Sequence, residues 1–141
     1  MKYLLDTDHI SLVHRKGDEG RLIETRLANM PADSVFVSIV SYEEQTRGWF
    51  AELARRRSFA QQEATYTELA HLLDLYCASP ILHLDLESVS EFHRLWLLRL
   101  RVGTMDLKIA AIAIANDAVL LTRNKTDFSK VPGLNIEDWV S

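Results

Sequence analysis

The sequence is poor in cysteine, proline and long apolar runs. It has one cysteine, Cys77, and three prolines in 141 residues. A single cysteine excludes a disulfide within the chain and suits a reducing compartment. No apolar run approaches the roughly 18 residues needed to cross a bilayer, and the run at 3–5 is too short for a signal peptide. We therefore expect a cytoplasmic protein without a membrane segment.

The chain also lacks an excess of positive charge and the common catalytic motifs. The net charge is −4, which argues against binding nucleic acid by bulk positive charge but leaves room for one basic strip. There is no P-loop, GxGxxG, GxSxG or HExxH motif. Because none has zinc-site spacing, we expect surface or packing roles for all five histidines: His9, His14, His71, His83 and His93.

Hydrophobic residues make up 48% of the chain and charged residues 26%, as in an ordinary globular protein. The length fits a single domain spanning 1–141. Short apolar runs rich in β-branched and aromatic residues predict strands at 3–5, 34–38, 81–84 and 119–122, with a brief fifth at 134–136. Helical periodicity dominates the intervening segments. This alternation predicts an α/β fold, with helices on both faces of a mainly parallel sheet of four to five strands.

Acidic residues follow several of the predicted strands. Asp6 comes directly after the first strand, and we place Glu44 in the first turn of the helix after the second. Asp106 lies in the first turn of the most apolar helix, and Asn124 and Asp127 follow the fourth strand. Because functional sites form at the carboxyl ends of parallel strands, these side chains are predicted to meet at one edge of the sheet.

Each acidic residue also has a purely structural interpretation. Asp6 or Asp8 is a suitable N-cap, Ser41 and Glu44 have the spacing of a capping box, and Asp106 complements a helix dipole. Together, however, several carboxylates held close repel one another, and a divalent cation relieves that repulsion. Oxygen ligands suit Mg²⁺, with Mn²⁺ as a substitute. Such a site serves phosphodiester hydrolysis well.

Five segments, in this order, resemble the PIN-domain ribonucleases, and specifically the VapC toxins of type II toxin–antitoxin pairs. They are YLLDTD (3–8), VSIVSYEEQTRG (37–48), GTMDLKIAAIAIA (103–115), LTRNKTDFSKVPGL (121–134) and IEDW (136–139). The resemblance covers essentially the whole chain, and the 121–134 segment is its most specific part. Between about 50 and 100 the chain matches only in being helical. The resemblance implies a three-layer α/β/α sandwich and a metal-dependent endoribonuclease that hydrolyses RNA with metal-activated water.

In the resembling segments, the family's first three acidic residues correspond to Asp6, Glu44 and Asp106. Glu44 is preferred over Glu43 because it stands four residues before the motif's Gly48. The fourth position is shared by Asp127 and Asn124, of which only Asp127 is a charged ligand. The resemblance further implies that Thr104 orients the site by hydrogen bonding, although an N-cap role explains this residue equally well.

Basic and apolar surfaces suggest partners. Phosphate contacts that position RNA without reading its sequence are predicted for four residues: Arg47, Lys108, Arg123 and Lys125. The segment 95–100 holds more apolar residues than one helix face buries, which indicates either core packing on two sides or an interface. The resemblance favours a homodimer or a hetero-oligomer with a VapB-like antitoxin, whose tail would cover the acidic groove.

Two alternative functions, from other classes of protein, are also considered. Asp6 and Asp8 match the start of the DxDxT signature of haloacid-dehalogenase-type phosphatases, but Ile10 stands where the threonine belongs and no later Asp-Asp pair follows a strand. The other alternative is a non-catalytic PIN-like module that binds RNA or a partner protein. The presence of all three main acids favours the nuclease over this module.

Overall fold

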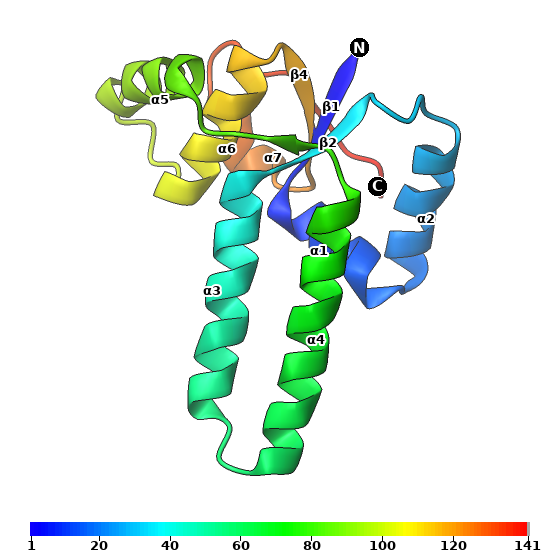
Figure 1. Cartoon of the computed structure of the whole chain (residues 1–141). Helices are drawn as coiled ribbons and strands as arrows, with labels where there is room; N and C mark the ends of the chain where they lie inside the picture. Colours follow the sequence, from blue (N-terminus) through cyan, green and yellow to red (C-terminus); the bar gives the residue numbers. More distant parts are fainter. Residues whose placement is uncertain (141) are drawn as a thin grey trace.

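A computed structural model describes residues 1–140. Five strands and seven helices alternate along this part of the chain (Figure 1), in the following order: β1 (Lys2–Leu5), α1 (Thr7–Arg15), α2 (Asp18–Ala28), β2 (Val35–Ser38), α3 (Ile39–Arg55), α4 (Phe59–Ala78), β3 (Ile81–Leu82), α5 (Leu86–Leu97), α6 (Thr104–Ala115), β4 (Ala118–Leu121), α7 (Lys125–Phe128) and β5 (Ile136–Glu137). Each predicted strand is present, and the predicted α/β fold is confirmed.

The strands form one sheet in the order β3-β2-β1-β4-β5, and every pairing is parallel. β1 is central: Leu4 pairs with Phe36 on β2 and with Leu120 on β4. All strands therefore point the same way, and their carboxyl ends lie at one edge of the sheet. The residues discussed below directly follow strands at that edge or lie on helices.

Two apolar clusters cover the two faces of the sheet. Because successive strand residues point to opposite faces, Leu4 packs in a cluster with α5 and α6, whereas Leu5 packs in a second cluster with α1, α2 and α4. The same alternation separates Leu120 from Leu121 on β4. The predicted three-layer α/β/α arrangement follows directly from this two-sided burial.

Helix α6 is the most deeply buried helix of the described chain. Residues 107 and 109–113 are buried on all sides, as its apolar composition predicts. It packs against α5 on one side and under the sheet on the other. This fixes the start of α6, and with it Asp106, relative to the strand ends.

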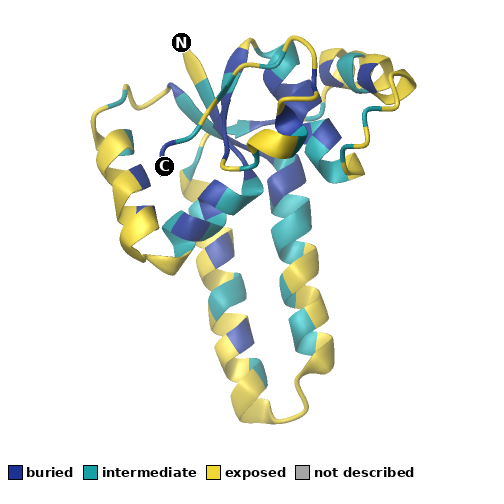
Figure 2. Ribbon diagram, turned by 180° about the vertical axis from the view of Figure 1, so that it is seen from behind, coloured by how far each residue is buried: buried dark blue, intermediate teal, exposed yellow. Residues whose placement is uncertain are grey.

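Helices α3 and α4 form a long antiparallel pair that extends away from the sheet (Figure 1). The far end of this pair is exposed (Figure 2). The apolar residues of α4 are unevenly buried, because Tyr66 and Leu73 are more than half exposed, whereas Leu72 and Tyr76 are buried. A helix that contacts only one neighbour for most of its length buries a narrow stripe, so some apolar residues beside that stripe stay in solvent.

Side-chain caps begin several helices. Ser58 and Asp85 cap α4 and α5, each accepting a hydrogen bond from the backbone N–H three residues later. The predicted capping box at Ser41 is wrong: α3 begins earlier, with Ser38 as its N-cap. Glu44 consequently lies in the second turn of α3, where no backbone donor of the helix start needs it.

No helix within residues 1–140 combines the length and the apolar composition that a membrane span needs. The longest, α4, has 20 residues but carries charged and polar side chains along its exposed face.

Candidate functional site

Four carboxylates gather where the strands end, and we call Asp6, Glu44, Asp106 and Asp127 the acidic quartet. Asp6 directly follows β1, Glu44 projects from the helix after β2, and Asp127 lies on α7, just after β4. These three strands are neighbours in the sheet. Asp106 comes from the first turn of α6, as predicted. The edge on which sequence analysis placed the acids is therefore the edge at which the fold brings them together.

The carboxyl group of Asp106 is electrostatically coupled to the other three members of the quartet. Its pKa is raised from 3.8 to about 6, first by partial burial and then by the negative charges of Glu44, Asp6 and Asp127. Each of the other three members therefore lies close enough to disfavour ionisation of Asp106. A divalent cation would relieve this repulsion, and four carboxylates are the oxygen donors that Mg²⁺ and Mn²⁺ prefer.

The quartet is more open than a compact metal cage. Within residues 1–140, the groups whose possible ligand atoms all lie within 4.8 Å of one another are Asp6-Asp8-His9 and His14-Glu68-His71. The quartet is not one of these tight groups. This openness fits a hard cation that keeps several of its waters and uses few direct carboxylate contacts.

Asp6 is buried, with 5% of its surface exposed, and has two roles. Its Oδ1 accepts a 2.8 Å hydrogen bond from the His9 backbone N–H and so caps α1. The capping interpretation of Asp6 is therefore correct, but it occupies only one of the two carboxylate oxygens. The buried His9 ring lies 3.4 Å from the same Oδ1 without hydrogen-bond geometry.

Glu44 is held in place from α1. The Thr7 hydroxyl donates a 2.7 Å hydrogen bond to Glu44 Oε1, and Thr7 Oγ1 also lies 2.9 Å from the buried Ser41 hydroxyl. Glu43, in contrast, forms a 2.6 Å ion pair with Arg47 on the same helix. The structure thus turns Glu44, and not Glu43, toward the quartet, in agreement with the sequence register.

Asn124 and Asp127, the two candidates for the fourth position, are hydrogen-bonded to each other. Asn124 Oδ1 accepts from the Asp127 backbone N–H and caps α7, while Asn124 Nδ2 donates to Asp127 Oδ2 at 3.1 Å. This hydrogen bond, and to a smaller extent a hydrogen bond from Lys130, holds the pKa of Asp127 below its usual value. Asp127 therefore supplies the charge, and Asn124 orients it and keeps it ionised.

The four predicted RNA-contacting residues differ in their surroundings. Arg47 is paired with Glu43. Arg123 contacts Asp8 through two nitrogens, at 2.8 and 3.1 Å, and Glu19 at 2.6 Å, so it is already paired with two carboxylates. Lys108 is half-buried on α6, two residues after Asp106, and Lys125 is exposed at the start of α7. For Thr104, the predicted N-cap role is wrong, because Gly103 occupies the N-cap of α6.

Polar residues of α1, α3 and α4 that surround Glu44 carry no sequence motif and were not predicted. Besides Thr7, Gln45 accepts a 2.6 Å hydrogen bond from the Tyr76 hydroxyl and donates to Ser11. Burial and the nearby Glu44 charge raise the pKa of Tyr76, which keeps it a donor. The position of Thr7, one residue after Asp6, was the available signal, but its partner on α3 is visible only in the fold.

A PIN domain family model matches residues 3–134. The ribonuclease VapC1 of Haemophilus influenzae strain R2866 is 26% identical over 145 residues, covering 99% of this chain and 98% of that protein. Among solved structures, a chain of DNA-bound VapBC from Salmonella typhimurium superimposes with a TM-score of 0.78 at 24% identity, covering 99% of this chain and 98% of that one. VapBC-1 from nontypeable H. influenzae gives 0.78 at 22% identity, with both chains covered completely.

These structural likenesses establish the fold, and the family match extends over nearly the whole chain. The phosphatase alternative is set aside by the same family match. The chain belongs to the PIN domain family, and its likeness to the VapC proteins confirms the resemblance drawn from its motifs.

Proposed function

We propose that this protein is a metal-dependent endoribonuclease that acts as the toxin of a toxin–antitoxin pair. The observation that carries the proposal is the electrostatic coupling of Asp106 to Glu44, Asp6 and Asp127. Such mutual repulsion is costly unless a cation binds there. Similar proteins are named ribonuclease VapC1, which supports RNA as the substrate class.

In this proposal Asp6, Glu44, Asp106 and Asp127 hold a Mg²⁺ ion, with Mn²⁺ as a substitute. A bound divalent cation supplies a water of lowered pKa and stabilises negative charge on the leaving oxygen. Thr7 fixes the Glu44 carboxylate, and Asn124 with Lys130 keeps Asp127 ionised. Lys108 and Lys125 lie beside quartet residues in the chain and are the proposed contacts to the RNA backbone.

The test is cleavage of structured RNA by the purified chain in EDTA, Mg²⁺ or Mn²⁺. We expect cleavage only with a divalent cation, and a loss of at least about a hundredfold in Asp6→Asn and Asp106→Asn, because direct ligands are removed. Cleavage in EDTA, or full activity in both variants, would overturn the proposal. Binding of RNA without cleavage under any metal condition would favour the non-catalytic PIN-like module instead.

The toxin role rests on the partners of similar proteins. Several solved structures similar to this chain are VapBC complexes, including DNA-bound forms from Salmonella typhimurium and Rickettsia felis. We propose a VapB-like antitoxin for this chain, in a hetero-oligomer or with a toxin homodimer. Exposed apolar residues at the end of α5, Trp96 and Leu97 with the C-cap Leu98, offer a surface for such a contact. Growth arrest on expression of the chain alone, relieved by coexpression of a short neighbouring reading frame, is the expected result.

A further inference from the structure

A second cluster of potential metal ligands lies away from the acidic quartet. His14 projects from α1, while Glu68 and His71 project from α4, and their possible ligand atoms all lie within 4.8 Å of one another. His14 Nε2 is 2.7 Å from Glu68 Oε2, and the two imidazole rings have centroids 6.2 Å apart. Sequence analysis assigned both histidines to surface or packing roles, because their separation along the chain resembles no zinc motif.

The geometry points to a binding site for a transition-metal divalent cation of the Zn²⁺ type, formed by His14, Glu68 and His71. Glu68 and His71 are three residues apart, so they share one face of α4 and reach the same point. Two imidazoles and one carboxylate are a ligand set that suits zinc and its neighbours, whereas Mg²⁺ prefers oxygen ligands alone. Three protein ligands leave a further coordination position for water.

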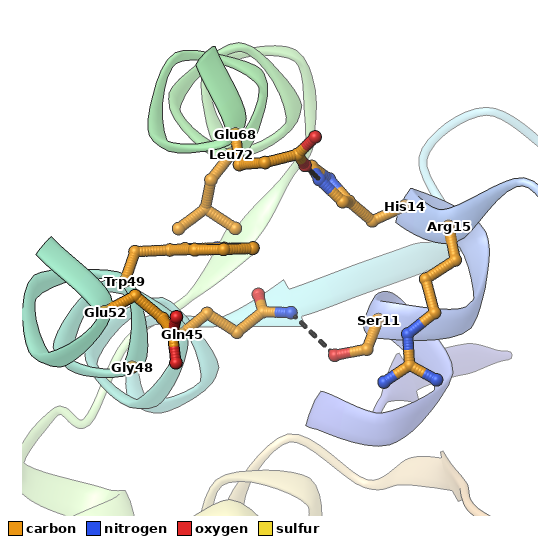
Figure 3. A pocket seen from close by; sticks show the side chains of 9 residues that line it. All are labelled: Ser11, His14, Arg15, Gln45, Gly48, Trp49, Glu52, Glu68 and Leu72. Atoms are coloured by element: carbon orange, nitrogen blue, oxygen red, sulfur yellow. Dashed lines mark hydrogen bonds and ion pairs between the residues drawn. The ribbon is translucent and has the colours of Figure 1, made fainter. Parts of the chain in front are cut away.

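The surroundings of the cluster allow a cation to enter. A cavity of about 510 Å³ lies between α1, α3 and α4, and Figure 3 shows Glu68 reaching from α4 toward His14 above the Trp49 ring. A second cavity, of about 450 Å³, is lined by His14 and His71 and also by Asp74. His14 is mostly covered, with 15% of its side chain exposed, while the Glu68 side chain is 40% exposed. One ligand is thus held in place by the fold, and the cluster stays open to solvent.

This site is distinct from the quartet. His14 lies eight residues after Asp6 on the same helix, about 12 Å along its axis at 1.5 Å per residue. A cation held there would join the end of α1 to α4. Since Asp6 and Thr7 stand at the beginning of α1, the cation would anchor the helix that presents them. The inference does not depend on the proposed ribonuclease activity.

The test is Zn²⁺ binding by the full, tag-free chain, measured by equilibrium dialysis in excess Mg²⁺ so that oxygen-ligand sites are filled. A Cys77→Ser background removes the exposed thiol on α4, which would compete for Zn²⁺. We expect one Zn²⁺ per chain, and an affinity at least about tenfold lower in His71→Ala. Because His71 is exposed, this variant should fold like the parent chain.

Two controls separate this site from other sites. His93→Ala removes an exposed histidine from α5 and should leave Zn²⁺ binding unchanged. Asp106→Asn should also leave Zn²⁺ binding unchanged, whether or not that variant cleaves RNA. Zn²⁺ should raise the thermal midpoint of the parent chain but not that of His71→Ala. Absence of Zn²⁺ binding, equal affinity in the parent and His71→Ala, or loss of binding in Asp106→Asn would overturn the inference.

Discussion

Thr7, at the start of α1, donates a 2.7 Å hydrogen bond to Glu44 on α3. This bond joins segments 37 residues apart in the sequence and fixes one carboxylate of the quartet. Thr7→Val keeps the shape of the side chain and removes the donor. We expect cleavage to require about 10- to 100-fold more Mg²⁺ for half-maximal rate, because groups that orient metal ligands typically contribute this much.

Thr7→Ser is the matched control, because it restores the hydroxyl. Its Mg²⁺ dependence should lie near that of the parent chain. An unchanged Mg²⁺ dependence in Thr7→Val would show that Glu44 does not need this hydrogen bond.

The raised pKa of Asp106 predicts a pH-dependent stability in the metal-free protein. Between pH 3.8 and about 6, the folded protein holds a proton that the unfolded chain has released. The stability contributed by this proton is therefore present at low pH and lost as pH rises to about 6. In EDTA, Asp106→Asn should have a higher thermal midpoint than the parent chain at pH 7, and the difference should shrink toward pH 4.

Glu43→Gln serves as the control for this measurement, because Glu43 is paired with Arg47 and is not among the charges acting on Asp106. Addition of Mg²⁺ at pH 7 should stabilise the parent chain more than Asp106→Asn. A difference between these two chains that is independent of pH would contradict the electrostatic coupling.

We predict that Lys108 contributes more to RNA binding than Arg123 does. Arg123 is already bound to Asp8 and Glu19, whereas Lys108 lies half-buried two residues after Asp106. In an Asp106→Asn background that prevents cleavage, Lys108→Ala should weaken RNA binding and lower its salt slope by about one. Arg123→Ala should change the slope less. Lys2→Ala, at the opposite end of the sheet, should leave the slope unchanged.

The close approach of α1 and α2 gives a prediction about stability. A Cβ on Gly20 of α2 would overlap the backbone carbonyl of Leu12, whereas a Cβ on Gly48 of α3 would meet open space. Gly20→Ala should destabilise the fold by about 1–3 kcal/mol or more through overpacking. Gly48→Ala should stabilise it by about 0.5–1 kcal/mol through helix propensity. Urea unfolding of both variants checks the opposite signs.

The sequence predicted the positions of the strands well, because apolar runs such as 3–5 and 119–122 are buried on both faces of a parallel sheet. It also predicted the quartet, since strand ends and helix starts can be located from such patterns. The details that the sequence did not predict share a cause. Which stripe of α4 is buried, where α3 begins, and which partners Arg123 binds all depend on contacts between segments distant in the chain.

The same cause hid the supporting residues and the second cluster. The Thr7–Glu44 hydrogen bond and the approach of His14 to Glu68 join residues 37 and 54 positions apart. A motif search detects ligands at short, regular spacing, as in HExxH. Ligands contributed by different helices become apparent only when those helices are packed.

The most direct measurement of the central claim compares Glu44→Gln with Glu43→Gln in Mg²⁺-dependent RNA cleavage. The two substitutions remove the same charge from adjacent positions of α3. Only Glu44 acts on Asp106 and bonds to Thr7, while Glu43 is neutralised by Arg47. We predict a loss of at least about tenfold at limiting Mg²⁺ for Glu44→Gln, and cleavage within about twofold of the parent chain for Glu43→Gln. Equal losses in the two variants, or a larger loss in Glu43→Gln, would contradict the account.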